Sequence, residues 1–129
     1  NEVKNIQEYI FQYQHAPLFM DRIEAIMKLK DMKEEAAARN TVVSALRDKS
    51  WLVRHTALSV IENLPDDERK AVHETLKEMA LHDQVSQVRA SAIEKLGKHY
   101  RMADNKEVFA QAAKDKSPLV IRVTEALKE

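Results

Sequence analysis

The segments Val53-Arg54-His55-Thr56-Ala57-Leu58 and Val88-Arg89-Ala90-Ser91-Ala92-Ile93 decide the fold of this chain. Both follow the pattern V-R-x-x-A-aliphatic, and each has another aliphatic residue, Ile61 or Leu96, a fixed distance after its Arg. Apolar residues at these spacings occupy one face of a helix. A pattern that recurs at a period of this length predicts an array of stacked helical repeats.

Two weaker copies of the pattern flank this pair. The upstream copy comprises Arg22, Ala25, Ile26 and Leu29, and the downstream copy comprises Asp115, Ile121, Arg122, Ala126 and Leu127. The four arginines are separated by 32, 35 and 33 residues, and the last copy is shifted by one residue. The period predicts about four helix pairs, each of which buries its apolar face by stacking on its neighbours.

Other helices are expected between these copies, at about residues 34–46, 66–82 and 105–114, because apolar residues recur there at helical spacing. Pro65 and the acidic residues after it predict the start of the second of these helices. Asn105 is expected to cap the third.

Two further expectations concern the helices that carry Arg54 and Arg89. The apolar face of the first is expected to continue to Leu64. Gly97 is expected to end the second helix, or to relax it near its end.

The composition limits the classes of protein to which the chain can belong. It has 129 residues with one Gly, three Pro and no Cys, which favours helices and excludes disulfides and thiol chemistry. Lys plus Arg and Asp plus Glu both number 21, so no excess positive charge favours nucleic acid or an anionic membrane surface. No apolar stretch is long enough for membrane insertion.

No catalytic, cofactor-binding or metal site is expected in this chain. His73-Glu74 begins an H-E-x-x-H zinc motif, but Lys77 stands where the second His is required. A single Gly excludes both the G-x-S-x-G elbow of a nucleophilic enzyme and a glycine-rich phosphate loop. The acidic clusters stand at predicted helix starts, where the helix dipole explains them.

Acidic residues recur in the short links before the helices that carry the arginines. Asp and Arg at matching positions of adjacent repeats can pair and so fix the stacking. We predict a structural inter-repeat ladder, whose members are Asp48, Asp83, Asp115, Arg54, Arg89 and Arg122. An anion-binding row of arginines on one face is the alternative interpretation.

The first fifteen residues permit two interpretations. The aromatic residues alternate as in a strand, at Tyr9, Phe11 and Tyr13, whereas the aliphatic residues have helical spacing, at Val3, Ile6 and Ile10. We expect a helix here, or a junction with a neighbouring domain. The possible contact surface comprises Trp51, Tyr9, Phe11 and Tyr13. The alternative for Trp51, which is the more common one for such a residue, is that it covers the seam between repeats.

The V-R-x-x-A-L pattern after a D-x-S link resembles HEAT repeats over about residues 16–129. The resemblance implies an all-α fold, an α-α superhelix or HEAT-like solenoid, in a single domain over residues 1–129. Residues 1–15 would be its junction or first helix. The repeats would cover about residues 16–47, 48–82, 83–114 and, in part, 115–129.

A second resemblance rests on residues 9–26, YIFQYQHAPLFMDRIEAI. This string resembles the join between the β-domain and the helical carboxy-terminal domain in zinc aminopeptidases of the aminopeptidase N type. The resemblance implies a non-catalytic domain that supports a catalytic domain and shapes substrate access. Zinc would then be expected only in the parent catalytic domain, and the partner would be the preceding domains of the same polypeptide.

Two other functions are considered. One is an independent HEAT-repeat scaffold that binds a protein or peptide partner; the other, a HEAT-type nucleic-acid enzyme, is disfavoured by the balanced charge. The chain begins at Asn1 without an initiating Met, has an aromatic first segment and stops abruptly at Glu129. We therefore expect a fragment of a larger protein.

Overall fold

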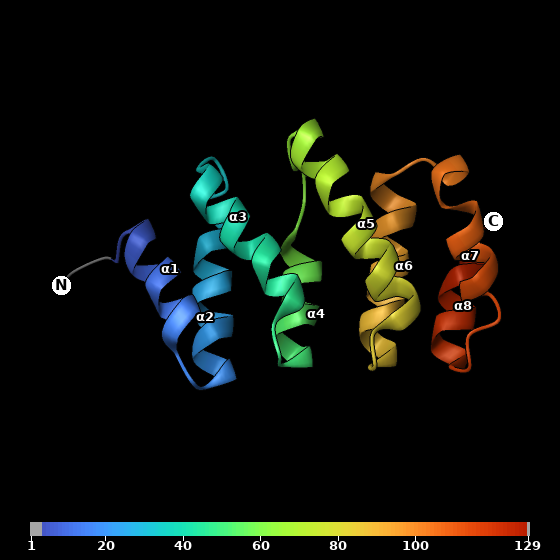
Figure 1. Ribbon diagram of the computed structural model, residues 1–129, viewed down its shortest axis with the longest axis horizontal. Helices are drawn as coiled ribbons and strands as arrows, with labels where there is room; N and C mark the ends of the chain where they lie inside the picture. The colour runs from blue at the N-terminus through green and yellow to red at the C-terminus, as the bar shows by residue number, and fades with distance from the viewer. Residues whose placement is uncertain (1–3, 129) are drawn as a thin grey trace. The chain divides into compact units, whose positions relative to one another are not determined.

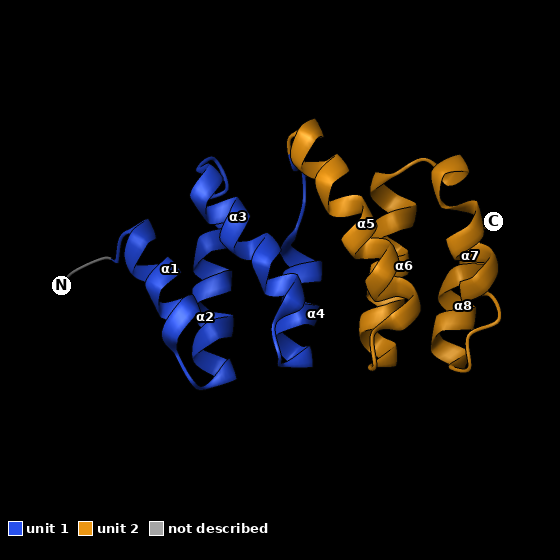
Figure 2. Cartoon of the chain, in the orientation of Figure 1, with its two compact units in different colours: residues 1–64 blue, residues 65–129 orange. Residues whose placement is uncertain are grey.

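The computed structural model describes residues 4–128, which fall into two compact units, residues 1–64 and 65–129 (Figure 2). The described residues form eight α-helices and two short 3₁₀ helices, and no strand occurs among them (Figure 1). The expected all-α class is confirmed. Val3 and Glu129, on which parts of the sequence argument rest, lie outside the described residues.

Unit 1 contains four α-helices. They are α1 (Ile6–His15), α2 (Phe19–Lys30), α3 (Ala36–Ser44), which continues into the 3₁₀ helix η1 (Ala45–Arg47), and α4 (Trp51–Val60). The first helices of the two pairs, α1 and α3, pack on each other, as do the second helices, α2 and α4. This two-layer packing encloses the fully buried side chains Ile26, Leu29, Leu46, Val53 and Leu58.

Unit 2 repeats this arrangement. It contains α5 (Asp66–His82), α6 (Ser86–His99), the 3₁₀ helix η2 (Met102–Asn105), α7 (Lys106–Ala112) and α8 (Pro118–Ala126). Helix α5 packs on α6 and α7, and α6 packs on α8. Its largest fully buried apolar side chains are Val88, Ile93, Leu96 and Val120. Each unit is thus a stack of two helix pairs, which is consistent with the expected α-α superhelix.

Local sequence signals account for two of the helix starts. Helix α1 begins with a capping box, in which Asn5 and Glu8 each accept a hydrogen bond from the other's backbone N–H at 2.9 Å. The expected helix in the first fifteen residues is therefore confirmed from Ile6 onward. The expected helix at about residues 66–82 is also confirmed, since α5 spans Asp66–His82 after Pro65.

One local expectation is wrong, and two are met only in part. Helix α4 ends at Val60 and does not continue to Leu64, because the link turns at Asn63, which has φ of 56°, and the residue before Pro65 avoids the helical region. Gly97 does not end α6, which continues to His99, but it lies near that end, and its expected relaxation of the helix there stays a prediction. Asn105 occupies the expected N-cap position of α7, but its side chain makes no cap hydrogen bond, because its amide bonds to His73 and to the Arg101 carbonyl oxygen.

Candidate functional site

Arginine–aspartate pairs join successive repeats inside each unit. In unit 1, Arg22 donates from Nε and Nη2 to the two carboxylate oxygens of Asp48, both at 3.0 Å. In unit 2, Arg89 makes the same two bonds to Asp115, both at 2.9 Å. All four side chains are at most 10% exposed, so each pair is a buried, bidentate ion pair.

A second set of bonds fixes each arginine to the link before its own helix. Arg22, Arg54 and Arg89 each donate from Nη1 to the carbonyl oxygen six residues earlier, at Ala16, Asp48 and Asp83, with distances of 3.0, 3.0 and 2.8 Å. The aspartates also order the links, because Asp48 and Asp115 each accept the backbone N–H two residues later at 2.8 Å. Arg22 and Arg89 therefore hold both the link and the next repeat, and Arg54 holds the link before its own helix.

The Asp48 carboxylate has one partner that Asp115 lacks. Tyr13 donates its hydroxyl to Asp48 at 3.0 Å, in addition to the bonds from Arg22 and from the Ser50 N–H. Burial alone would raise the pKa of Asp48, but these hydrogen bonds hold it below its usual value. Burial and the bond to Asp48 raise the pKa of Tyr13.

The ladder residues named from sequence are distributed unequally. Arg89 and Asp115 are paired, whereas Arg122 is exposed and Ile121 takes the position six residues after Asp115. Arg22, which was not among the expected members, is the partner of Asp48. Arg22 and Asp48 are 26 residues apart, and so are Arg89 and Asp115. This equal separation is the sequence signal that could have identified Arg22 as the partner of Asp48.

The four aromatic residues expected as a contact surface lie in different surroundings. Tyr9 is buried in α1, whereas Tyr13 is half-buried against Asp48. Phe11 is 61% exposed and stacks on His15 with the ring centroids 4.0 Å apart. Trp51 is partly exposed at the start of α4 and lies edge-on to His55.

Unit 1 carries a set of exposed apolar side chains on its second helices. Five large side chains of α2 and α4 are more than a third exposed; they are Phe19, Met20, Met27, Trp51 and Leu52, which we call the apolar face. Helices α2 and α4 pack side by side, so the five side chains belong to one pair of neighbouring helices.

The repeat itself does not require this apolar character. The positions to compare lie three and two residues before Arg22, Arg54 or Arg89 and five residues after it. In α2 they hold Phe19, Met20 and Met27, and in α4 they hold Trp51, Leu52 and Ser59. In α6 the same positions hold Ser86, Gln87 and Glu94. Because α6 folds with polar residues there, the apolar residues of α2 and α4 need an explanation other than repeat packing.

Neither a metal-binding cluster nor a membrane-spanning helix occurs among the described residues. No group of three or more His, Asp or Glu side chains among residues 4–128 could hold a metal ion. No described helix combines the length and the apolar character needed to cross a membrane. The expectation that the chain holds no cofactor stays a prediction.

The stacked helix pairs and their arginine–aspartate bonds define a helical repeat protein. The model of the family described as HEAT repeats matches residues 14–97. The chain therefore belongs to the HEAT-repeat family, whose fold is generally non-catalytic and typically mediates protein interactions. No curated protein and no solved structure matches the chain.

Proposed function

We propose that this chain is a non-catalytic scaffold that binds a protein partner through the apolar face of α2 and α4. The observation that carries the proposal is the contrast between helices: Met20 and Leu52 are exposed at the position that Gln87 occupies in α6. Exposed apolar side chains on neighbouring helices are typical of protein interfaces. The polarizable Met side chains and Trp51 suit such a contact.

The test begins with a photo-crosslinking amino acid placed at Met20 in the full chain and, as a matched control, at Gln87. A protein crosslinked from Met20 but not from Gln87 is identified by mass spectrometry, purified and titrated calorimetrically. We expect Leu52→Glu to weaken its binding at least tenfold, about 1.4 kcal/mol, and Gln87→Glu to change it little. Equal affinity of the wild type and Leu52→Glu would overturn the assignment of this face.

A finer proposal is that the partner is the catalytic part of a zinc aminopeptidase in the same polypeptide. Its support is the resemblance carried by residues 9–26. In the structure these residues form most of α1, the link and most of α2, and two of them, Tyr13 and Arg22, bond to Asp48. Repeat packing thus accounts for part of the string, while Phe19 and Met20 belong to the apolar face.

This finer proposal has its own test. The coding sequence upstream of the Asn1 codon should contain H-E-x-x-H and a downstream Glu in the same reading frame. If this region encodes no such metallopeptidase, the aminopeptidase proposal is wrong, while the scaffold proposal is still decided by the crosslinking experiment.

A further inference from the structure

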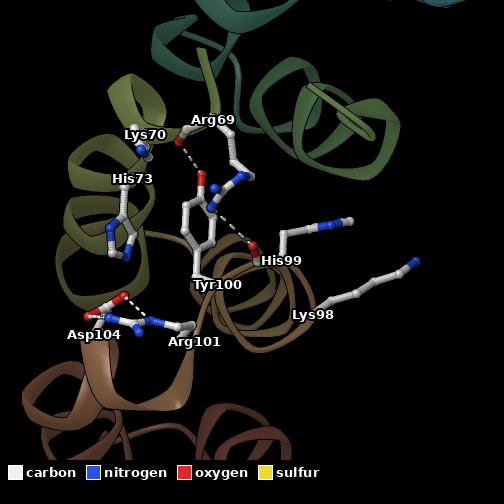
Figure 3. Close-up of a pocket in the computed structure, with 8 residues that line it drawn as sticks. All are labelled: Arg69, Lys70, His73, Lys98, His99, Tyr100, Arg101 and Asp104. Carbon is white, nitrogen blue, oxygen red and sulfur yellow. Dashed lines mark hydrogen bonds and ion pairs between the residues drawn. The ribbon is translucent and has the colours of Figure 1, made fainter. Parts of the chain in front are cut away.

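A basic cavity lies within unit 2. Its volume is about 650 Å³, and its walls come from the first turns of α5, the end of α6 and the residues that follow α6 (Figure 3). Four cationic side chains line it, Arg69, Lys70, Lys98 and Arg101, whereas Asp104 is the one carboxylate among its described lining residues. This local excess is notable because the chain as a whole has no net charge.

Ring contacts and a hydrogen bond join three lining residues of the cavity, Arg69, His73 and Tyr100. The Tyr100 ring stacks on His73, with centroids 4.2 Å apart and planes 8° from parallel, and the Arg69 guanidinium lies 5.3 Å from the Tyr100 ring centroid. Figure 3 shows His73 and the Arg69 guanidinium on opposite sides of Tyr100. The Tyr100 hydroxyl donates to the Arg69 carbonyl oxygen at 2.6 Å, which ties the chain after α6 to α5.

A second connection passes through the buried amide of Asn105. Its Oδ1 accepts a hydrogen bond from His73 Nε2 at 2.8 Å, and its Nδ2 donates to the Arg101 carbonyl oxygen at 3.1 Å. These two bonds fix the segment that carries Arg101 and Asp104 against α5. Hydrogen bonds that already hold the backbone around a site lower the entropic cost of binding a ligand there.

Arg69 retains capacity to donate to a ligand, whereas Arg101 already donates from Nε and Nη2 to Asp104. Arg69 donates to the His99 carbonyl oxygen over a long 3.4 Å, and its Nη2 is 3.8 Å from Asp66, beyond hydrogen-bonding distance. A guanidinium has five N–H donors, so these contacts orient Arg69 without saturating it. Lys70 is exposed beside it on the same turn of α5.

We propose that this cavity binds a phosphate monoester group. Four cations against one carboxylate favour a ligand with more than one negative charge, and the donors of Arg69 and Lys70 suit a group with several acceptor oxygens. The group could belong to a free phosphorylated metabolite or to a phosphorylated side chain of a protein, since both present the same dianion. This proposal concerns unit 2 alone and does not depend on the scaffold function proposed for the apolar face.

The test uses inorganic phosphate as the probe, titrated into the isotopically labelled full chain at constant ionic strength and followed by amide chemical shifts. We expect saturable shifts confined to the backbone around residues 69–73 and 98–105. The double variant Lys70→Gln, Arg101→Gln should weaken binding about fivefold or more. Both side chains are exposed, so the variant should keep the wild-type spectrum elsewhere.

Lys114→Gln is the matched control, because Lys114 is exposed in unit 2 but does not line the cavity. Non-saturating shifts, or equal weakening by the control, would refute the proposal. Acetate that binds as tightly as phosphate would also overturn it, in favour of a carboxylate site. Titrations of O-phosphoserine and of a phosphoserine peptide then distinguish the two sources, and saturable binding of either at the cavity supports the phosphate site.

Discussion

The Asp115→Asn variant tests whether the buried ion pairs stabilise the repeats. Asp115 accepts two bonds from Arg89 at 2.9 Å and one from the Ser117 N–H at 2.8 Å, and its side chain is 10% exposed. Asn keeps one acceptor oxygen but loses the charge, and its NH₂ group faces an Arg89 donor. We expect the free energy of unfolding to fall by about 2–4 kcal/mol.

Urea denaturation followed by far-UV circular dichroism measures this loss, and pH provides an internal check. The hydrogen bond from Arg89 lowers the pKa of Asp115 in the folded state. Its stabilisation is therefore complete above the unfolded-state pKa of about 3.9 and is lost as the pH falls from there through the lower folded-state pKa. The difference in unfolding free energy between the wild type and Asp115→Asn should shrink as the pH falls over this range.

The control is Asp104→Asn, which makes the same chemical change in the same unit. Asp104 and its partner Arg101 are largely exposed, so we expect no resolvable shift in the denaturation midpoint. The reasoning fails if Asp115→Asn is as stable as this control. It also fails if the loss caused by Asp115→Asn stays constant at acid pH.

Three other variants test the packing, each by urea denaturation. Tyr13→Phe should cost about 1 kcal/mol at neutral pH, because the bond to Asp48 is lost. Burial raises the pKa of Tyr13, so the stabilisation by its neutral hydroxyl is lost as the pH rises from about 10 through the higher folded-state pKa. Tyr13→Phe should therefore reduce the fall of the unfolding free energy at alkaline pH. An equal fall in the variant and the wild type would contradict this role of Tyr13. Gly97→Ala should raise the free energy of unfolding by about 1 kcal/mol in a Leu127→Ala background, through the higher helix propensity of Ala. The gain should be smaller in the wild type, because the new Cβ would lie 2.7 Å from Leu127 Cδ2. Equal gains in both backgrounds would exclude this clash. Ile93→Ala should cost about 2–5 kcal/mol, since Ile93 is fully buried, and a loss below 1 kcal/mol would mean that the site collapses around the smaller side chain.

The helices could be predicted from sequence because their signals are local. Apolar spacing and the acidic start after Pro65 located α5, and the weaker periodicity at residues 34–46 located α3 with some error at its ends. The end of α4 was not predicted, since the apolar pattern continues into a link that turns at Asn63. Periodicity reports which residues are buried, and residues in a link can be buried too.

The candidate site could be predicted only in part. The recurrence of Asp and Arg indicated a ladder, but Arg22 was overlooked and Arg122 was included, because a one-residue shift changes the direction of a helical side chain. The apolar face was foreseen at Trp51 alone. Its other members became visible through their exposure, which depends on the packing of α2 against α4.

The sequence by itself determined the helical repeats of this protein, because helix formation and amphipathic spacing act over a few neighbouring residues. Only the tertiary structure decided which side chains meet: Arg89 pairs with Asp115, 26 residues away, and Tyr100 lies between Arg69 and His73. These contacts join helices that are distant in the chain. They depend on how the helices stack, and the spacing of residues along one helix carries no information about that.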